Sequence, residues 1–158
     1  MIQPSTEETT VGIADDAVEI RAQGWRTLAA LYGALDGDLE RALQRTHTLS
    51  VVEYTVLDAL SRQDGWHMRM SQLARATALS SSATTRLVNR LEDRGLLRRI
   101  LCAEDRRGIY TELTESGRRL LQEARPTHDA TLEASLTQAR ELPELAPLVH
   151  ALSELYAR

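Results

Sequence analysis

Apolar residues in the first third of the chain recur in alternating steps of three and four positions. This spacing predicts a long helix over residues 15–46 that packs along another helix. Its apolar stripe consists of Trp25, Leu28, Tyr32, Leu35, Leu39 and Ala42. Three glycines interrupt the helix and lower its intrinsic stability, so we expect a packing partner to support it. Residues 1–14 are polar without periodicity and predict a disordered arm.

A second helix is predicted from Ser50 to about Arg62. Ser50 is a good N-cap, and Glu53 follows three residues later, which is the spacing of a capping box. After an Asp64-Gly65 turn, residues 66–69 predict a short extended piece. The apolar stripe expected to be buried in the helix is Val52, Val56, Leu57 and Leu60.

Two further helices lie close together in the middle of the chain. The first is predicted over residues 71–77 with Ser71 as its cap, and its inward residues are Leu73 and Ala74. A tight connection at Ala78-Leu79 leads to a helix over residues 80–94, capped by Ser80 and ended by Gly95. Two short helices joined in this way predict a helix-turn-helix.

Alternating apolar residues then predict two antiparallel strands over residues 96–101 and 109–113, joined by a loop over residues 102–108. This hairpin would form a wing beside the helix-turn-helix. Thr114 predicts the cap of a long helix to about Ala139, with a kink at Pro126. A last helix begins at Leu142-Pro143, and its apolar stripe is Leu145, Leu148, Leu152 and Leu155.

Charge is unevenly distributed along the 158 residues. The chain has a net charge of −4, yet residues 62–107 contain twice as many arginines as acidic residues. The arginines are at positions 62, 69, 75, 86, 90, 94, 98, 99, 106 and 107. Such a division indicates one basic face on an acidic body, which is typical of nucleic-acid binding. Aromatic residues make up only 4%, so a stacking platform for single strands is not expected.

The helix over residues 80–94 has two distinct faces. Ala83, Leu87 and Leu91 repeat every four residues and should be buried. A separate polar stripe carries hydroxyl, amide and guanidinium groups, which can reach base edges in a major groove, and its N-terminal N–H groups can meet a phosphate. The residues predicted to contact DNA here are Ser80, Ser81, Ser82, Thr85, Arg86, Asn89 and Arg90. The alternative is an ordinary solvated helix face.

The loop of the wing carries a dense charged cluster. Arg106 and Arg107 lie near its tip, where a guanidinium can enter a minor groove. Asp105 would repel a phosphate backbone unless it is paired, so we interpret it as the partner that orients Arg107. Gly108 supplies a residue that tolerates positive φ. The alternative interpretation is a charged turn without a binding role.

Three segments together resemble the MarR family of bacterial winged-helix transcription regulators: "EYTVLDAL", "MRMSQLARATALSSSATTRLVNRLEDRGLLRR" and "EDRRGIYTELTESGRRLL". The resemblance covers roughly residues 20–158. It implies that Arg107 enters the minor groove while Asp105 holds it, and that the helix carrying Arg86 and Asn89 enters the major groove. Many relatives have a D-P-R-like turn where this chain has residues 102–104, Cys-Ala-Glu, so by the resemblance we expect a differently shaped wing that lacks one phosphate contact.

The resemblance also implies an organisation and a function. We expect a mostly α (α+β) protein with a disordered arm (1–14), a dimerisation helix (15–47), a winged helix-turn-helix DNA-binding domain (48–114) and C-terminal dimerisation helices (115–158). It would bind a palindromic operator as a homodimer and repress transcription until a small aromatic or anionic effector releases it. We expect it in the bacterial cytoplasm, on the nucleoid and not in a membrane.

Relatives bind effectors where the first helix meets the winged domain, which makes Trp25, Tyr32 and His47 candidate lining residues, with core or dimer packing as the alternative. The four histidines never pair at helical spacing, so we predict no metal site and no cofactor. No catalytic motif is present, and an enzyme is not expected. Two other functions stay open: a winged helix that binds an acidic protein partner, and a sensor of oxidants or metals, with Cys102 as the candidate thiol.

Overall fold

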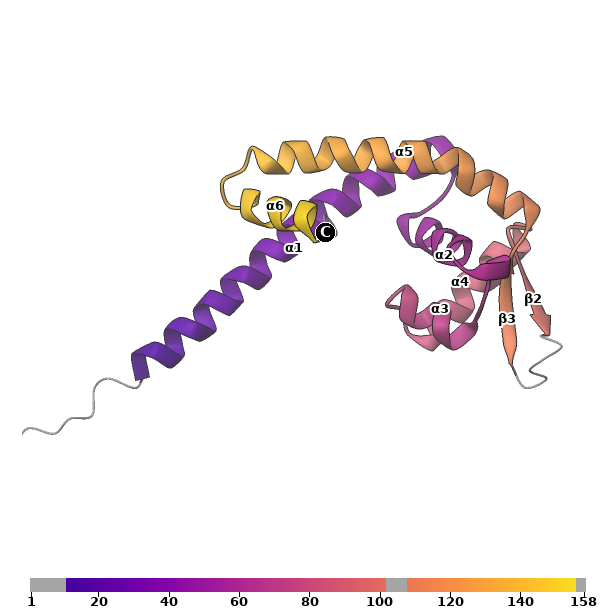
Figure 1. Ribbon diagram of the computed structural model, residues 1–158, viewed down its shortest axis with the longest axis horizontal. Coiled ribbons are helices and arrows are strands. Elements are labelled where there is room, and N and C mark those ends of the chain that lie inside the picture. Colours follow the sequence, from indigo (N-terminus) through magenta and orange to yellow (C-terminus); the bar gives the residue numbers. More distant parts are fainter. Residues whose placement is uncertain (1–10, 102–107, 156–158) are drawn as a thin grey trace, which may run out of the picture. The chain divides into compact units, whose positions relative to one another are not determined.

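The computed structural model describes residues 11–101 and 108–155, with the backbone alone for residues 11–15. The chain is mostly helical, with one small antiparallel sheet, as the sequence predicts (Figure 1). In chain order the elements are α1 Val11–His47, α2 Val51–Ser61, η1 Asp64–Trp66, β1 His67–Arg69, α3 Met70–Ala76, α4 Ser81–Asp93, β2 Leu97–Leu101, β3 Ile109–Leu113, α5 Glu115–Arg140 and α6 Ala146–Glu154.

The chain divides into two compact units. Unit 2 is the continuous segment Asp38–Leu132, and unit 1 combines Met1–Gly37 with Glu133–Arg158. The boundaries fall inside α1 and α5, so each of these helices contributes to both units. Helix α1 begins at Val11, four residues before the predicted start, so residues 11–14 of the predicted disordered arm are helical instead.

The sheet of unit 2 has the strand order β1-β3-β2 and is antiparallel throughout. Strands β2 and β3 pair from Leu97↔Leu113 to Leu101↔Ile109 and form the predicted hairpin. Of the short extended piece predicted at residues 66–69, residues 67–69 form strand β1, which pairs with the other side of β3, whereas Trp66 ends the 3-10 helix η1. A single core joins the sheet to α2, α3, α4 and the first half of α5; its fully buried members include Val56, Leu57, Leu60, Leu73, Val88 and Leu91.

Capping residues define the ends of several helices in unit 2. The Ser50 side chain accepts a hydrogen bond from the Glu53 N–H at 3.1 Å while the Glu53 carboxylate accepts from the Ser50 N–H at 2.9 Å, which confirms the predicted capping box. Ser80 caps α4, and Gly95, at φ 71°, follows its end. Thr114 Oγ1 accepts from the Gly117 N–H at 3.0 Å and caps α5, which continues through Pro126.

Two predictions about these helices are wrong. Helix α3 begins at Met70 with Arg69 as its N-cap, because the Gln72 side chain accepts the Arg69 N–H at 3.1 Å; Ser71 is therefore inside the helix. Val52 remains 42% exposed although it belongs to the stripe expected to be buried. Tyr54 and Glu53, whose carboxylate closes the capping box, are buried instead of Val52. The face of α2 that packs on the core therefore includes these two positions.

The start of α5 packs very closely against the chain before β2. A Cβ added at Gly117 would lie 2.2 Å from the backbone oxygen of Leu96. Any residue with a side chain at position 117 would therefore clash with that oxygen. Thr114 contributes to the same contact, since its N–H donates to the Leu96 oxygen at 3.1 Å. Gly117 is thus required by close approach of two backbones.

Unit 1 has a small core of its own. Leu31 of α1, Ala139 of α5, and Leu145 and Val149 beside or within α6 are buried together, with Leu35, Leu136 and Leu148 packed against them. Helix α6 begins at Ala146, four residues after the predicted Leu142 start, because the intervening residues form turns. None of the described helices is long and apolar enough to span a membrane.

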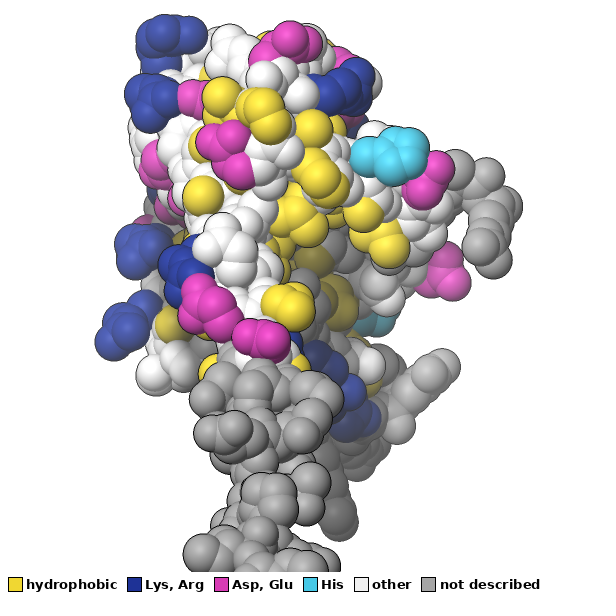
Figure 2. Space-filling model, turned by 90° about the vertical axis from the view of Figure 1, so that its left-hand side faces the viewer, with side chains coloured by type: hydrophobic (Ala, Val, Ile, Leu, Met, Phe, Trp, Pro, Cys, Tyr) yellow, Lys and Arg dark blue, Asp and Glu magenta, His cyan; other side chains and the backbone are white. Residues whose placement is uncertain are grey.

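Many large apolar side chains of unit 1 stay exposed in the single chain. They include three members of the predicted α1 stripe and the last two of the α6 stripe. Figure 2, which views the molecule from the left-hand side of Figure 1, shows hydrophobic side chains gathered on that face. We call this set the apolar surface of unit 1: Val18, Ile20, Trp25, Leu28, Tyr32, Leu142, Leu152 and Leu155. The apolar stripes of α1 and α6 are thus only partly buried by the chain itself.

Candidate nucleic-acid interface

Helix α4 separates its residues into a buried and an exposed face. Thr84, Leu87, Val88 and Leu91 are buried in the core of unit 2. On the opposite side Ser82, Thr85, Arg86 and Asn89 are all exposed, as the sequence predicts. We call these four residues the α4 polar face. Ala83, expected to be buried, is only half-buried, because Thr84 and Val88 lie at the centre of the face of α4 that packs on the core of unit 2.

The first turn of α4 is tied by hydroxyl groups. Ser80 Oγ accepts from the Ala83 N–H at 3.2 Å and lies 3.3 Å from Ser82 Oγ. The Thr85 hydroxyl donates to the Ser81 carbonyl at 2.9 Å. Toward DNA, Thr85 can therefore accept a hydrogen bond through its oxygen lone pairs or make an apolar contact through its methyl group. Ser80, Ser81 and Ser82 are all exposed at the positive end of the helix dipole. This turn can receive an anionic oxygen.

Asn89 is the member of the α4 polar face whose side chain is held by another element. Arg99 of β2 donates from Nη2 to Asn89 Oδ1 at 2.5 Å. Glu92, one turn along α4, fixes this arginine by accepting the Arg99 backbone N–H at 2.8 Å and by an ion pair with its guanidinium. No local pattern in the sequence connects Asn89 with Arg99, because their contact depends on how the hairpin packs on α4.

Arg86 and Arg90 contrast with that arrangement. Both are exposed on α4, and neither makes an ion pair with any residue in the described part of the chain. Neighbouring arginines of β2 are neutralised, since Arg98 pairs with Glu112 and Arg99 with Glu92. A guanidinium without an acidic partner keeps its full attraction for a phosphate or a base acceptor.

The other end of α4 is fixed by a clamp that the sequence did not suggest. Arg94 pairs with the buried Glu53 at 3.2 Å and donates to the Thr48 carbonyl at 2.8 Å. Glu53 therefore caps α2 and anchors the C-terminus of α4 at the same time. Because both the core and this clamp hold α4, the α4 polar face is presented by a rigid element.

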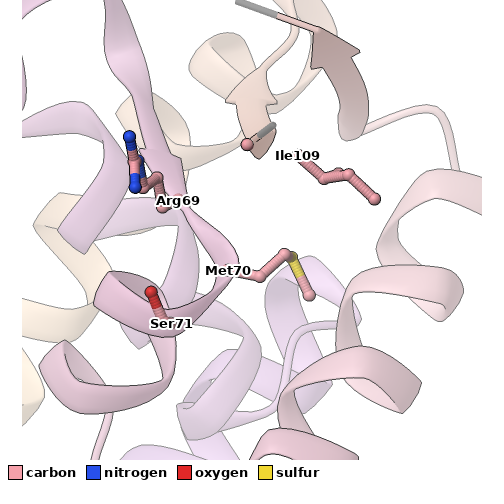
Figure 3. A pocket seen from close by; sticks show the side chains of 5 residues that line it. Arg69, Met70, Ser71 and Ile109 are labelled. Atoms are coloured by element: carbon pink, nitrogen blue, oxygen red, sulfur yellow. The ribbon is translucent and has the colours of Figure 1, made fainter. Parts of the chain in front are cut away.

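A shallow pocket lies where β1 leads into α3, lined by Arg69, Met70, Ser71, Gly108 and Ile109. In Figure 3 the side chains of Met70 and Ile109 extend to one side, and those of Arg69 and Ser71 to the other. Tyr110 of β3 holds the arginine, since Arg69 Nε donates to its hydroxyl at 2.9 Å. This places another guanidinium at the base of the wing.

The loop residues of the wing that the sequence singles out lie outside the described residues. These are Cys102, Asp105, Arg106 and Arg107. Their proposed roles stay predictions. The strands that carry the loop are described, and they end in two exposed apolar residues, Leu101 and Ile109.

The three effector candidates lie in different surroundings. Trp25 and Tyr32 belong to the apolar surface of unit 1 and are 68% and 66% exposed. The carboxylate of Asp36, which lies beside Tyr32, raises the pKa of the Tyr32 phenol, with partial burial as a smaller cause. His47, in unit 2, lies with Nε2 2.8 Å from Thr127 Oγ1. Their role in effector binding stays a prediction.

A second pocket of unit 2 lies between the start of α5 and the turn before β1. Trp66, held at φ 56°, lies under the guanidinium of Arg118 at 3.9 Å, and Arg125 pairs with Asp58 at 3.0 Å. Close by, Tyr54 stacks on His128 with ring centroids 4.3 Å apart, and burial raises the pKa of Tyr54.

Among the residues that the structure describes, no three His, Cys, Asp or Glu side chains converge on a metal-binding position.

The chain is similar to several known proteins. A family model described as MarR family matches residues 47–108, which include α2, α3, α4 and β2. The structure of AbsC, a MarR family transcriptional regulator from Streptomyces coelicolor, is 35% identical, with a TM-score of 0.70 over 82% of this chain and 86% of that one.

Two further structures are similar at lower identity. Sco3205, a MarR family transcriptional regulator from Streptomyces coelicolor solved in complex with DNA, is 28% identical, with a TM-score of 0.70 over 83% of this chain and 82% of that one. The transcriptional regulator BldR from Sulfolobus solfataricus is 27% identical, with a TM-score of 0.71 over 87% and 95%. Given the family match and the identity to AbsC over most of both chains, the protein belongs to the MarR family of transcriptional regulators.

Proposed function

We propose that this protein is a transcription regulator that binds duplex DNA sequence-specifically by inserting α4 into the major groove. The observation that carries the proposal is the α4 polar face: four exposed side chains with donors and acceptors, on a helix fixed by the core behind it. An α-helix fits the width of a major groove, and these groups match those displayed by base edges. The relative Sco3205 was solved in complex with DNA, which supports DNA binding by this chain.

The basic groups around α4 supply the affinity that does not depend on sequence. Arg86 and Arg90 are exposed without an acidic partner among the described residues, and Ser80, Ser81 and Ser82 lie at the helix N-terminus. Guanidinium groups and free N–H groups hold phosphates and thereby fix the position of the reading helix. On the wing, Arg106 and Arg107 would reach the adjacent minor groove, with Asp105 orienting Arg107.

The protein would act as a homodimer on a palindromic operator. The apolar surface of unit 1 is the support, since it leaves Trp25, Leu28 and Tyr32 in water in the single chain. A second copy covering this surface would relate two α4 helices by a two-fold axis, and a two-fold protein matches a palindromic site. Repression in the bacterial cytoplasm, relieved by a small aromatic or anionic effector, completes the proposal.

Selection of bound fragments from a library of random duplexes tests this function. Enrichment of an inverted repeat whose half-sites lie about one helical turn apart is the expected result. The matched comparison is binding to a scrambled duplex of equal length and composition at the same salt concentration. Equal affinity for both duplexes would contradict sequence-specific reading and favour a winged helix that binds an acidic protein partner.

A further inference from the structure

We infer that Arg99 determines which base Asn89 reads, by turning the oxygen of the Asn89 amide away from DNA. The inference rests on the proposed function and adds a specificity-determining residue that does not itself have to touch a base. Three residues carry it: Asn89 on the α4 polar face, Arg99 on β2, and Glu92, which holds Arg99 in place.

The geometry leaves Arg99 little freedom. Its backbone N–H donates to Glu92 Oε1 at 2.8 Å, and its guanidinium pairs with the other oxygen of the same carboxylate. The side chain is 33% exposed and that of Glu92 is 23% exposed, so the ion pair is partly shielded from water. From this position Arg99 Nη2 reaches Asn89 Oδ1 at 2.5 Å.

The orientation of the Asn89 amide follows from the chemistry of its partner. A guanidinium has five N–H donors and no acceptor, so the atom that faces Arg99 has to be the oxygen of the amide. The nitrogen, with its two N–H donors, then points away from Arg99. Since Asn89 is exposed on the α4 polar face, it presents N–H donors outward instead of a donor beside an acceptor.

This orientation changes the base that suits Asn89. A free Asn side chain reads adenine with two hydrogen bonds, because it accepts from N6 while it donates to N7. With the oxygen held by Arg99, only the donor end remains, and guanine offers two acceptors, O6 and N7, to it. We therefore expect guanine to be preferred over adenine at the operator position that Asn89 reaches.

The test measures binding to a panel of the selected operator with all four bases at each position. The position read by Asn89 is the one at which Asn89→Ala loses base preference. There the wild type should favour guanine over adenine by about tenfold, within the range of one good base contact. Arg99→Met should reduce this ratio to about twofold or reverse it, because the freed amide can pair with adenine.

Four matched variants separate this role from a general loss of charge or fold. Arg98→Met removes the same charge from the neighbouring residue of β2, whose guanidinium pairs with Glu112 of β3, and should leave the ratio unchanged. Arg99→Lys keeps a cationic donor and should retain most of the preference. Glu92→Gln weakens the hold on Arg99 and should shift the ratio in the same direction as Arg99→Met, by less. Asn89→Asp preserves the acceptor for Arg99 but loses the outward donors, and should abolish the guanine preference.

Several outcomes would overturn the inference while the proposed function stands. One is a uniform loss of affinity in Arg99→Met with an unchanged guanine-to-adenine ratio, which would make Arg99 a phosphate contact only. Another is an equal change of the ratio in Arg98→Met. A third is an Asn89→Ala variant with wild-type preference at every position. Failure of the wild type to distinguish any selected duplex from a scrambled one would instead overturn the proposed function, and the inference with it.

Discussion

The α4 polar face and the apolar surface of unit 1 are both exposed in the single chain, but they differ in chemistry. The first presents hydroxyl, amide and guanidinium groups on a helix packed into the larger core. The second presents Trp25, Leu28, Tyr32 and other large apolar groups on helices around a much smaller core. Water solvates the first at little cost and the second at a high cost, so exposure has a different meaning in each.

The difference teaches which kind of partner each surface suits. A polar face whose guanidinium, that of Arg86, has no acidic partner among the described residues gains by meeting an anion with hydrogen-bonding edges, and duplex DNA is such a partner. A large apolar surface gains by being buried, and a second copy of the same chain offers a surface of the same kind. Each surface can be altered separately, and the predictions below range from the largest expected effect to the smallest.

Removing residues 140–158 should have the largest effect. The deletion takes away Leu145 and Val149, which are buried against Leu31 in the core of unit 1. Losing large buried side chains costs about 2–5 kcal/mol each, so unit 1 should unfold and the chain should aggregate. Light scattering and circular dichroism measure this. A well-folded monomer at micromolar concentration would contradict both the core assignment and the proposed dimer.

Leu152→Ser is the milder control for that deletion. Leu152 is exposed in the single chain, so the substitution should leave the fold of the chain intact and weaken only the association of two copies. Sedimentation at several concentrations should show more monomer than in the wild type. An unchanged monomer–dimer equilibrium would remove α6 from the proposed interface.

Arg86→Ala should weaken operator binding by about 1–3 kcal/mol and relax the base preference at one position. The reason is that this guanidinium is exposed on the α4 polar face without an acidic partner among the described residues. Arg119→Ala is the matched control, since it removes an arginine of α5 that is also exposed. If both variants lose the same affinity at every operator sequence, α4 supplies charge and does not read bases.

The wing provides a third prediction, on residues outside the described part of the chain. Arg107→Ala should lower affinity across operator variants and make the salt dependence shallower, by about one counterion per wing. Asp105→Ala should weaken binding as well, although it removes a negative charge from the DNA side. The double variant should lose less than the sum of the two, because Asp105 acts through Arg107. Tighter binding by Asp105→Ala in a titration would show that Asp105 only repels DNA.

Tyr32 provides the smallest expected effect, in the pH dependence of the dimer. The neighbouring Asp36 already raises the pKa of Tyr32, and burial under a second copy would raise it further. The neutral phenol is then favoured in the dimer, so association is at full strength below the ordinary tyrosine pKa of about 10 and weakens as the pH rises through the raised value. Sedimentation at pH 8 and at a pH of about 10.5 should show this, with a change of at most about tenfold. The Tyr32→Phe variant should associate equally at the two pH values. If its association weakens between them as much as that of the wild type, Tyr32 lies outside the interface.

Local sequence signals predicted much of unit 2. Ser50 with Glu53, Ser80, and Gly95 each fix a helix end through hydrogen bonds between residues close in sequence, and these ends are confirmed. The exposure of the α4 polar face followed from helical periodicity alone. Ser71 failed as a cap because the Gln72 side chain satisfies the N–H of Arg69, which places the start of α3 one residue before Ser71.

Contacts between distant residues were beyond such signals. Periodicity sorts residues by helix face but does not say which neighbour covers a face, so the prediction that Val52 is buried is wrong. It also gave no indication that Arg99 holds Asn89, or that Glu53 pairs with Arg94 forty-one residues away. Whether the exposed half of the apolar stripes is covered depends on a second chain, which the periodicity of one chain cannot specify.

The close approach of two backbones at Gly117 determines which mutations this position can tolerate. Its Cα lies so near the Leu96 carbonyl that any added Cβ would stand 2.2 Å from the oxygen, and every other amino acid has at least that atom. Each single-nucleotide missense change in the glycine codon therefore introduces the same clash, whatever the polarity of the new side chain. In a saturation library this codon should be depleted of all replacements alike, whereas the codon for the exposed Ser116 beside it should vary freely.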